Sequence, residues 1–268
     1  MRLWRGGGGY ALSAILIICG LGRAAGAWAA AWPEDPGHSE IIASFEPGSA
    51  SRGYDATGHA DAPLDNWRQT EASLYIDHGV TSRFSLATKL NFKVYNTDNI
   101  KFSGLSSLEI DGRYALHVGN DYVLAVGAGL EGLGKGRRSD YDNLFGRQGT
   151  DLDLRIYLGR NFRIARTPAF IDLQAARHIR QFNPDEWRLE GTLGLKPSPR
   201  WMVMAQVFSG RADRQNGYQA QWLNTELSVV RSLGASQKTS LQLGLRQTTA
   251  GRNVPRVNAF IVSLWRRY

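Results

Sequence analysis

The sequence predicts an all-β fold, an antiparallel transmembrane β-barrel of about 12 strands that follows a cleaved signal peptide. Three observations lead to this prediction. The N-terminus has the layout of an export signal, apolar and polar residues alternate with a period of two, and the segments between the alternating stretches are long and short in turn. The first observation indicates the compartment, and the other two indicate the architecture.

Residues 1–27 have the three-part layout of a secretory signal. Arginines precede an uncharged apolar run (YALSAILIICGL), and mostly small residues follow it (AGAWAAA). Because the run is shorter than a bilayer-spanning helix, we expect cleavage after Ala27, or up to four residues later, rather than an uncleaved anchor. The mature protein then has a periplasmic leader over 28–39 and an outer-membrane barrel over 40–268.

Composition excludes several classes of protein. The single cysteine, Cys19, lies in the expected signal, so disulfide-stapled scaffolds and thiol-ligated metal sites are excluded. After the signal, no apolar run approaches the length of a membrane-spanning helix, which excludes a helical membrane protein. The net charge of +8 comes from interleaved basic and acidic residues rather than a basic patch, so we expect no nucleic-acid partner.

Alternation of apolar and polar residues decides the fold class. Within 83–94 (RFSLATKLNFKV), one parity carries Phe84, Leu86, Leu90, Phe92 and Val94. A pleated strand places these side chains on one face and the charged and amide side chains on the other. The same pattern recurs at 106–118, 151–159 and 239–248, and no helical period fits these segments.

Counted through the chain, the alternating stretches predict a barrel with an even number of strands. The expected strands are 40–46, 67–78, 83–94, 105–118, 122–131, 151–159, 169–180, 186–196, 201–209, 220–230, 239–248 and 257–268. Long outer loops and short periplasmic turns alternate in the same way in outer-membrane barrels. An even number of strands leaves both termini on the periplasmic side.

A soluble β-sandwich or a lipocalin-like barrel would also show alternation. Alternation alone therefore does not tell whether the apolar face of each strand points outward to lipid or inward to a core. The export signal, the strand length and the aromatic residues near strand ends favour the membrane. The aromatic residues expected at the two interfaces are Phe84, Tyr122, Trp201 and Trp265 at periplasmic ends, and Trp67, Trp187 and Trp222 at outer ends. Because Trp222 falls on the polar parity, some of these rings are expected to pack inside.

The last segment carries a more specific pattern. It resembles the terminal signal that the barrel-assembly machinery of Gram-negative bacteria recognises, with an aromatic last residue and apolar residues on one parity: Phe260, Val262, Leu264 and Tyr268. Arg266 interrupts the pattern, and its long side chain can reach toward water. We therefore expect the assembly machinery and outer-membrane lipids as partners.

Four segments together resemble a known family. They are AWPEDPGHSEIIASFEP, WRQTEASLYIDHGVTSRFSLATKL, RTPAFIDLQAARH and PSPRWMVMAQ. They are similar to outer-membrane proteins grouped as transporters of the phenol meta-pathway type, and the resemblance spans most of the mature chain. It implies an outer-membrane location and passive uptake of small solutes, with aromatic compounds as one class. It brings no catalytic residues and no cofactor.

The sequence offers little for catalysis or for metal binding. None of its five histidines occurs in an HxH or HExxH motif. In an enzymatic barrel a Ser or carboxylate must lie beside a His near the outer leaflet. Only His178 lies at that height, and Asp172 and Asp185 are six and seven positions away from it. We predict no catalytic residue and no metal site, and keep a lipid-modifying enzyme as a third hypothesis.

Charged and small residues on the polar parity are expected to line the lumen. They are Glu71, Asp77, Lys89, Glu109, Asp111, Arg113, Gly127, Gly129, Asp153, Arg155, Asp172, Arg188, Glu190, Glu226 and Arg246. Their charges either pair and close the interior or border a narrow polar channel. The two glycines leave one strand face almost bare, which predicts a solute groove beside it. Basic residues in one outer loop would attract anionic solutes: Lys135, Arg137 and Arg138.

The favoured hypothesis is therefore a porin-like passive channel in the outer membrane for small solutes, aromatic or anionic. A closed structural or adhesive barrel is the alternative.

Deleting Tyr268 is expected to reduce membrane insertion several-fold, whereas Tyr268→Phe is expected to insert normally, because only the deletion removes the terminal ring. The measurement is the fraction of protein that shifts in a gel when the sample is boiled. Equal fractions for the two variants would show that the terminal strand does not carry the assembly signal.

Overall fold

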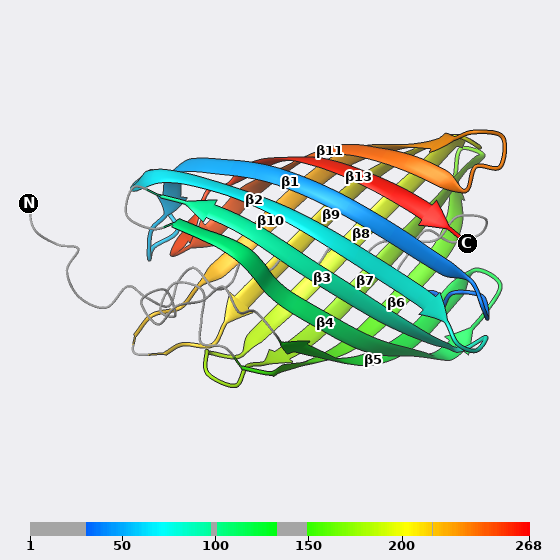
Figure 1. The fold of residues 1–268 in the computed structure, drawn as a ribbon, viewed down its shortest axis with the longest axis horizontal. Helices are drawn as coiled ribbons and strands as arrows, with labels where there is room; N and C mark the ends of the chain where they lie inside the picture. The colour runs from blue at the N-terminus through cyan, green and yellow to red at the C-terminus, as the bar shows by residue number, and fades with distance from the viewer. Residues whose placement is uncertain (1–30, 98–100, 133–148, 216) are drawn as a thin grey trace, which may run out of the picture.

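The computed structural model describes residues 31–97, 101–132, 149–215 and 217–268, and these form a closed antiparallel β-barrel (Figure 1). The expected signal peptide lies outside the described residues. The strands are β1 (Ser39–Tyr54), β2 (Ala62–Gly79), β3 (Phe84–Asn96), β4 (Lys101–Val118), β5 (Tyr122–Gly132), β6 (Asp151–Ile164), β7 (Thr167–Ile179), β8 (Glu186–Ser198), β9 (Trp201–Ala212), β10 (Gln221–Leu233), β11 (Thr239–Arg252), β12 (Val254–Pro255) and β13 (Asn258–Arg267).

Each strand pairs with its neighbour in the sequence, and β1 closes the barrel by pairing with both β2 and β13. The two-residue β12 also pairs with β1, so β12 and β13 together occupy one position in a barrel of 12 strands. Among the described strands, this closure leaves no unpaired edge. Among the described residues, no helix is long and apolar enough to cross a membrane.

The barrel is apolar outside and polar inside. On β3, Leu86 and Leu90 are each 41% exposed on the outer face, whereas Lys89, between them, points inward and is 2% exposed. A soluble β-sandwich or lipocalin-like barrel would bury the leucines and expose the lysine. The reversed arrangement excludes the soluble alternatives.

Several strands extend beyond the alternating stretches that predicted them. The first expected strand, 40–46, is observed as β1 over Ser39–Tyr54, and the second, 67–78, as β2 over Ala62–Gly79. The added residues of β1 (PGSASRGY) do not alternate. Alternation is required only where one face meets an apolar surrounding. The sequence pattern therefore marks the central part of each strand rather than its full length.

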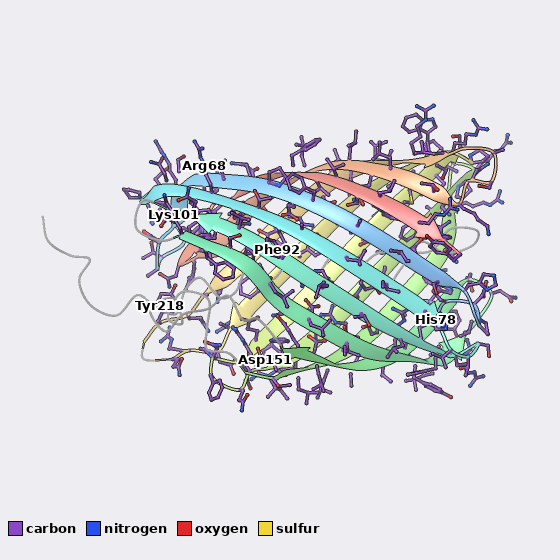
Figure 2. The ribbon with its side chains drawn as sticks, in the orientation of Figure 1. Arg68, His78, Phe92, Lys101, Asp151 and Tyr218 are labelled. Atoms are coloured by element: carbon purple, nitrogen blue, oxygen red, sulfur yellow. The ribbon has the colours of Figure 1, made fainter. Side chains whose placement is uncertain are left out.

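The two ends of the barrel differ in the length of the connections between strands. One end, called the turn end, carries the C-terminus, His78 and short turns such as 80–83 and 165–166 (Figures 1 and 2). At the tightest of these turns Ala165 and Arg166 both have positive φ, as a two-residue type I′ hairpin requires. The opposite end, called the loop end, carries the longer connections.

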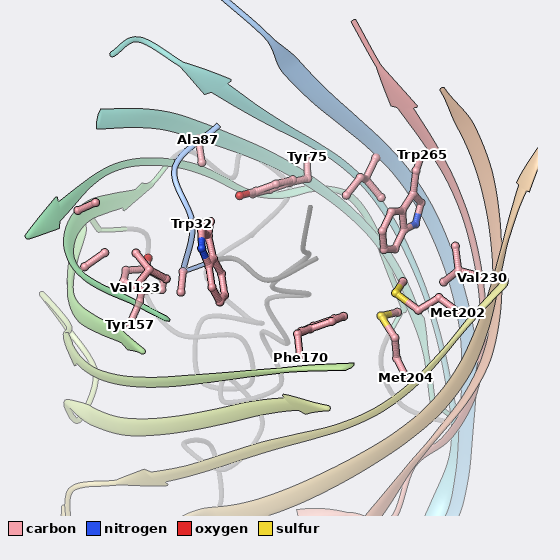
Figure 3. Packing of buried hydrophobic residues seen from close by; sticks show 14 residues of the cluster. Trp32, Tyr75, Ala87, Val123, Tyr157, Phe170, Met202, Met204, Val230 and Trp265 are labelled. Atoms are coloured by element: carbon pink, nitrogen blue, oxygen red, sulfur yellow. The ribbon is translucent and has the colours of Figure 1, made fainter. Parts of the chain in front are cut away.

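Aromatic residues fill part of the interior rather than forming two complete outer belts. Trp187 and Trp201 are exposed on the outer face as expected, but Trp67, Trp222 and Trp265 are buried inside. The prediction that Trp67 and Trp265 belong to the outer belts was wrong, because both fall on the inward parity of β2 and β13. An apolar cluster toward the turn end includes Tyr75, Tyr157, Phe170, Met202, Met204, Val230 and Trp265 (Figure 3).

Packing within this cluster predicts the effect of Gly194→Ala. A Cβ atom at Gly194 would collide with the Phe170 ring, so the variant is expected to lower the free energy of unfolding by about 1–3 kcal/mol, the usual cost of overpacking. Urea-dependent unfolding in micelles measures the change. The matched control is Gly191→Ala on the outer face, where the nearest contact is a flexible Val207 methyl group at 3.2 Å. Equal urea midpoints for the two variants would contradict the prediction.

Candidate functional site

The barrel interior is the candidate site, because the antiparallel strands turn every second side chain into it. All the residues predicted to line the lumen lie on inward faces, most of them buried and Glu71, Asp111 and Gly127 half-buried. Wide water-filled pores leave such side chains exposed. The described interior is therefore closely packed, and its charges must be paired.

Arg113 on β4 connects three elements of the interior. Its Nη2 donates a hydrogen bond to Asp77 Oδ2 at 2.6 Å and another to the Trp32 carbonyl oxygen at 3.2 Å. The guanidinium carbon lies 5.7 Å from the centroid of the Tyr157 ring. This arginine thus joins β2, β6 and the segment that precedes β1.

Arg155 on β6 is the centre of a second network. Its Nε donates to Asp153 Oδ1 at 3.1 Å, and its Nη1 lies 3.0 Å from Glu190 Oε1 on β8. Nη1 also donates to Gln174 Oε1 at 2.7 Å, and the amide of Gln174 donates to Asp172 at 2.8 Å. One cation therefore lies between two carboxylates from different strands, which holds β6, β7 and β8 in register on the inner face.

His178 lies near the loop end, surrounded by acidic residues. Its Nε2 is 3.4 Å from Asp151 Oδ2 and 3.5 Å from Glu131 Oε2, and its Nδ1 is 3.4 Å from Asp153 Oδ2. Within the described residues, every ion pair of His178 is with a carboxylate, and no group of His, Cys, Asp or Glu is arranged to hold a metal ion. His178 is therefore held in a cluster of acidic side chains contributed by β5 and β6.

Arg246 on β11 forms a third network, which joins β11 to β1 and β10. Its Nη1 lies 2.8 Å from Glu46 Oε2 on β1, and its Nη2 lies 2.7 Å from Glu226 Oε2 on β10. The guanidinium carbon is 4.8 Å from the centroid of the Phe208 ring. A single arginine thus compensates two buried carboxylates near the seam where β1 and β13 close the barrel.

Charge pairs at the loop end differ from those inside. Arg177 bridges Asp185 at 2.9 Å and Asp213 at 2.6 Å, and all three side chains are partly exposed. The hydrogen bond from Arg177 lowers the pKa of Asp213, which lies in the connection after β9. These exposed pairs are screened by solvent, so they contribute less to stability than the interior pairs.

The groove predicted beside Gly127 and Gly129 is absent. A Cβ atom at Gly127 would meet the Tyr157 ring at 3.0 Å, and one at Gly129 would collide with the Asp111 carboxylate. Side chains from β6 and β4 thus occupy the space above the glycines. The prediction was wrong because parity shows which way a side chain points but not how far a neighbour reaches. The basic loop residues Lys135, Arg137 and Arg138 lie outside the described residues.

A segment that the sequence did not identify as part of the site enters the barrel before β1. Ala31 and Trp32 are buried inside, and the Trp32 ring lies over Gly159 of β6, where a Cβ atom would collide with it (Figure 3). The Ala31 N–H donates to Asp172 Oδ2 at 2.8 Å. Its only signal in the sequence was a Trp-Pro pair in a stretch without strand pattern. We call residues 31–36 the N-terminal insert.

Beside the N-terminal insert, a cavity of about 570 Å³ lies at the turn end. Its floor includes Met202 and Val230 of the apolar cluster. The charged side chains that line it are Glu34, Asp35, Lys196, Arg200, Lys238 and Arg267. We call this cavity the turn-end vestibule. It joins the apolar part of the interior to a mainly basic rim.

Arg246→Met is expected to lower the free energy of unfolding by about 3–5 kcal/mol, because it removes the guanidinium that pairs with the buried carboxylates of Glu46 and Glu226. The triple variant Glu46→Gln, Glu226→Gln and Arg246→Met should recover most of the loss. Arg177→Met, which breaks only partly exposed pairs, should cost less than about 1 kcal/mol. Urea unfolding in micelles compares the three, and equal losses for both arginine variants would refute the assignment.

Comparison with known proteins supports the fold. No protein-family model matches the chain, and no curated protein sequence matches it. An outer membrane channel from Pseudomonas putida F1 is similar over 89% of this chain and 98% of its own, at 13% identity and a TM-score of 0.71. The NanC porin is similar over 84% of this chain and 98% of its own, at 9% identity and a TM-score of 0.55. The KdgM porin in complex with disordered oligogalacturonate is similar over 85% of this chain and 98% of its own, at 10% identity and a TM-score of 0.53. The chain thus has the fold of outer-membrane channel barrels.

Proposed function

We propose that the protein is a narrow channel in the outer membrane through which small solutes pass passively. The reversed polarity of the barrel carries this proposal, because an apolar outer face suits lipid and a charged inner face suits polar solutes. The similarity to channel barrels supports it. Outer-membrane lipids and the barrel-assembly machinery are the partners that this location requires.

The interior favours small solutes that combine an apolar ring with an anionic group. Rings and methionines of the apolar cluster, such as Phe170 and Met202, offer contacts to an aromatic ring. Four basic side chains at the turn-end vestibule outnumber its two acidic ones, Glu34 and Asp35, which favours an anion. The resemblance to transporters of the phenol meta-pathway type agrees with an aromatic solute.

A closed structural or adhesive barrel is the second candidate, and a specific observation favours it. Many of the interior charges form buried ion pairs, and the N-terminal insert occupies the lumen beside them. Under the channel hypothesis the insert has to move before a solute passes. The two hypotheses therefore differ in whether the insert is a gate or a permanent part of the barrel.

Trp32→Ala is expected to raise the open probability or conductance of the refolded protein in planar bilayers at least several-fold, because it removes the ring that lies over Gly159. Trp187→Ala, which removes an exposed ring on the outer face, is the control and should conduct like the unsubstituted protein. Gel shifts on boiling establish that both variants are folded. Folded protein that never conducts, with or without Trp32, would defeat the channel and leave the closed barrel.

A further inference from the structure

An open groove of about 670 Å³ crosses the outer face of the barrel from β7 to β13. Two rows of outward side chains border it. The second row is apolar throughout, and its Leu227 and Leu245 are 61% and 66% exposed, so the groove opens toward lipid. The members of the first row, each paired in register with the next, are Leu173, Gly191, Val207, Thr225, Gln247 and Asn258.

The first row changes from apolar to polar along its length. It is apolar as far as Val207 on β9, and from Thr225 on β10 its side chains form hydrogen bonds. The amide of Gln247 donates to Asn258 Oδ1 at 2.8 Å on this outer face. Polar side chains on a lipid-facing surface are stable at the level of the headgroups rather than in the hydrocarbon. The groove therefore leads from hydrocarbon to headgroups.

Beyond Asn258 the same row continues across the seam of the barrel and becomes cationic. Its next members, all exposed, are Ser49, Arg68, Asn96 and Lys101. Arg68 and Lys101 are two strand spacings apart, roughly 10 Å, and Figure 2 shows both at the loop end. Among the residues that the structure describes, no carboxylate forms an ion pair with either of them, whereas Arg52 pairs with Asp61 at 2.8 Å.

This order of side chains matches the parts of one kind of ligand. An apolar groove suits acyl chains, and neutral amides and hydroxyls suit the hydroxyl groups of a sugar. Two unpaired cations suit a phosphate, to which a guanidinium donates two hydrogen bonds at once. A soluble anion would leave the groove unused. A second copy of the chain would bring the same two cations against this face.

We propose that this row binds a phosphorylated, acylated sugar lipid of the leaflet at the loop end. Its acyl chains lie in the groove, its sugar contacts Gln247 and Asn258, and its phosphate lies between Arg68 and Lys101. The inference rests on the outer-membrane location in the proposed function and not on conduction. Protein that binds the lipid but never conducts would defeat the channel alone, and conducting protein that does not bind it would defeat this inference alone.

The first test measures binding of lipid A, an acylated and phosphorylated disaccharide, to the folded protein in neutral micelles by native mass spectrometry. Arg68→Gln with Lys101→Gln is expected to weaken binding at least ten-fold, and the phosphate-free form of the lipid should bind both proteins equally weakly. The matched control is Arg231→Gln with Arg266→Gln, which removes two exposed arginines near the turn end and should bind like the unsubstituted protein. Equal affinities for the two double variants would overturn the phosphate site.

The second test addresses the groove. Ala205 is exposed and lines it, so Ala205→Trp fills the groove without entering the interior and is expected to weaken lipid A binding at least several-fold. Ala43→Trp places the same ring on the outer face of β1, outside the groove, and should bind normally. Gel shifts on boiling establish that both variants are folded.

Two outcomes would assign the surface to another occupant. Inorganic phosphate that displaces lipid A completely, together with normal binding by Ala205→Trp, would indicate a site for soluble anions and overturn the lipid. A dimer in lipid-free micelles that Ala205→Trp abolishes would indicate a contact between two copies of the chain and overturn it as well.

Discussion

The structure depends on one constraint, which is that every backbone N–H and C=O group of a strand in a bilayer needs a partner within the protein. The chain meets it by closing the sheet, with β1 hydrogen-bonded to β2 on one side and to β13 on the other. Once the sheet is closed, side chains have only two directions. Apolar side chains face outward and charged ones face inward, so the interior has to neutralise many charges in a small volume.

The interior resolves this by pairing charges along the wall rather than across the diameter. Arg155 pairs with Asp153 on its own strand and with Glu190 on β8, and Arg246 pairs with Glu226 on β10 and Glu46 on β1. The pairs between different strands also fix the register of those strands. The space that remains toward the turn end is apolar, and the Trp32 ring lies within it. The N-terminal insert thus completes the packing of an interior that strand side chains alone leave unfilled.

Parity along the chain predicted the strands and the inward or outward direction of their side chains, because a pleated strand fixes that direction locally. It did not predict the ends of β1 and β2, where the pattern stops before the hydrogen bonding does. It also missed how Tyr157 and Asp111 fill the space over the glycines of β5, and how Trp32 enters the barrel. Both depend on side-chain reach and on contacts between distant parts of the chain.

The contacts of the N-terminal insert set the energy that any passage must overcome. Displacing it breaks the hydrogen bonds from Ala31 to Asp172 and from Arg113 to Trp32, each to a charged group. Such bonds contribute about 1.5–3 kcal/mol each, so two of them keep the displaced state below about 1% of the population. A solute shifts that equilibrium only if it binds the open state better than the closed one. Under the channel hypothesis, an anionic solute with an aromatic ring is suited to this, because it can replace both the indole at the apolar cluster and the carbonyl oxygen at Arg113.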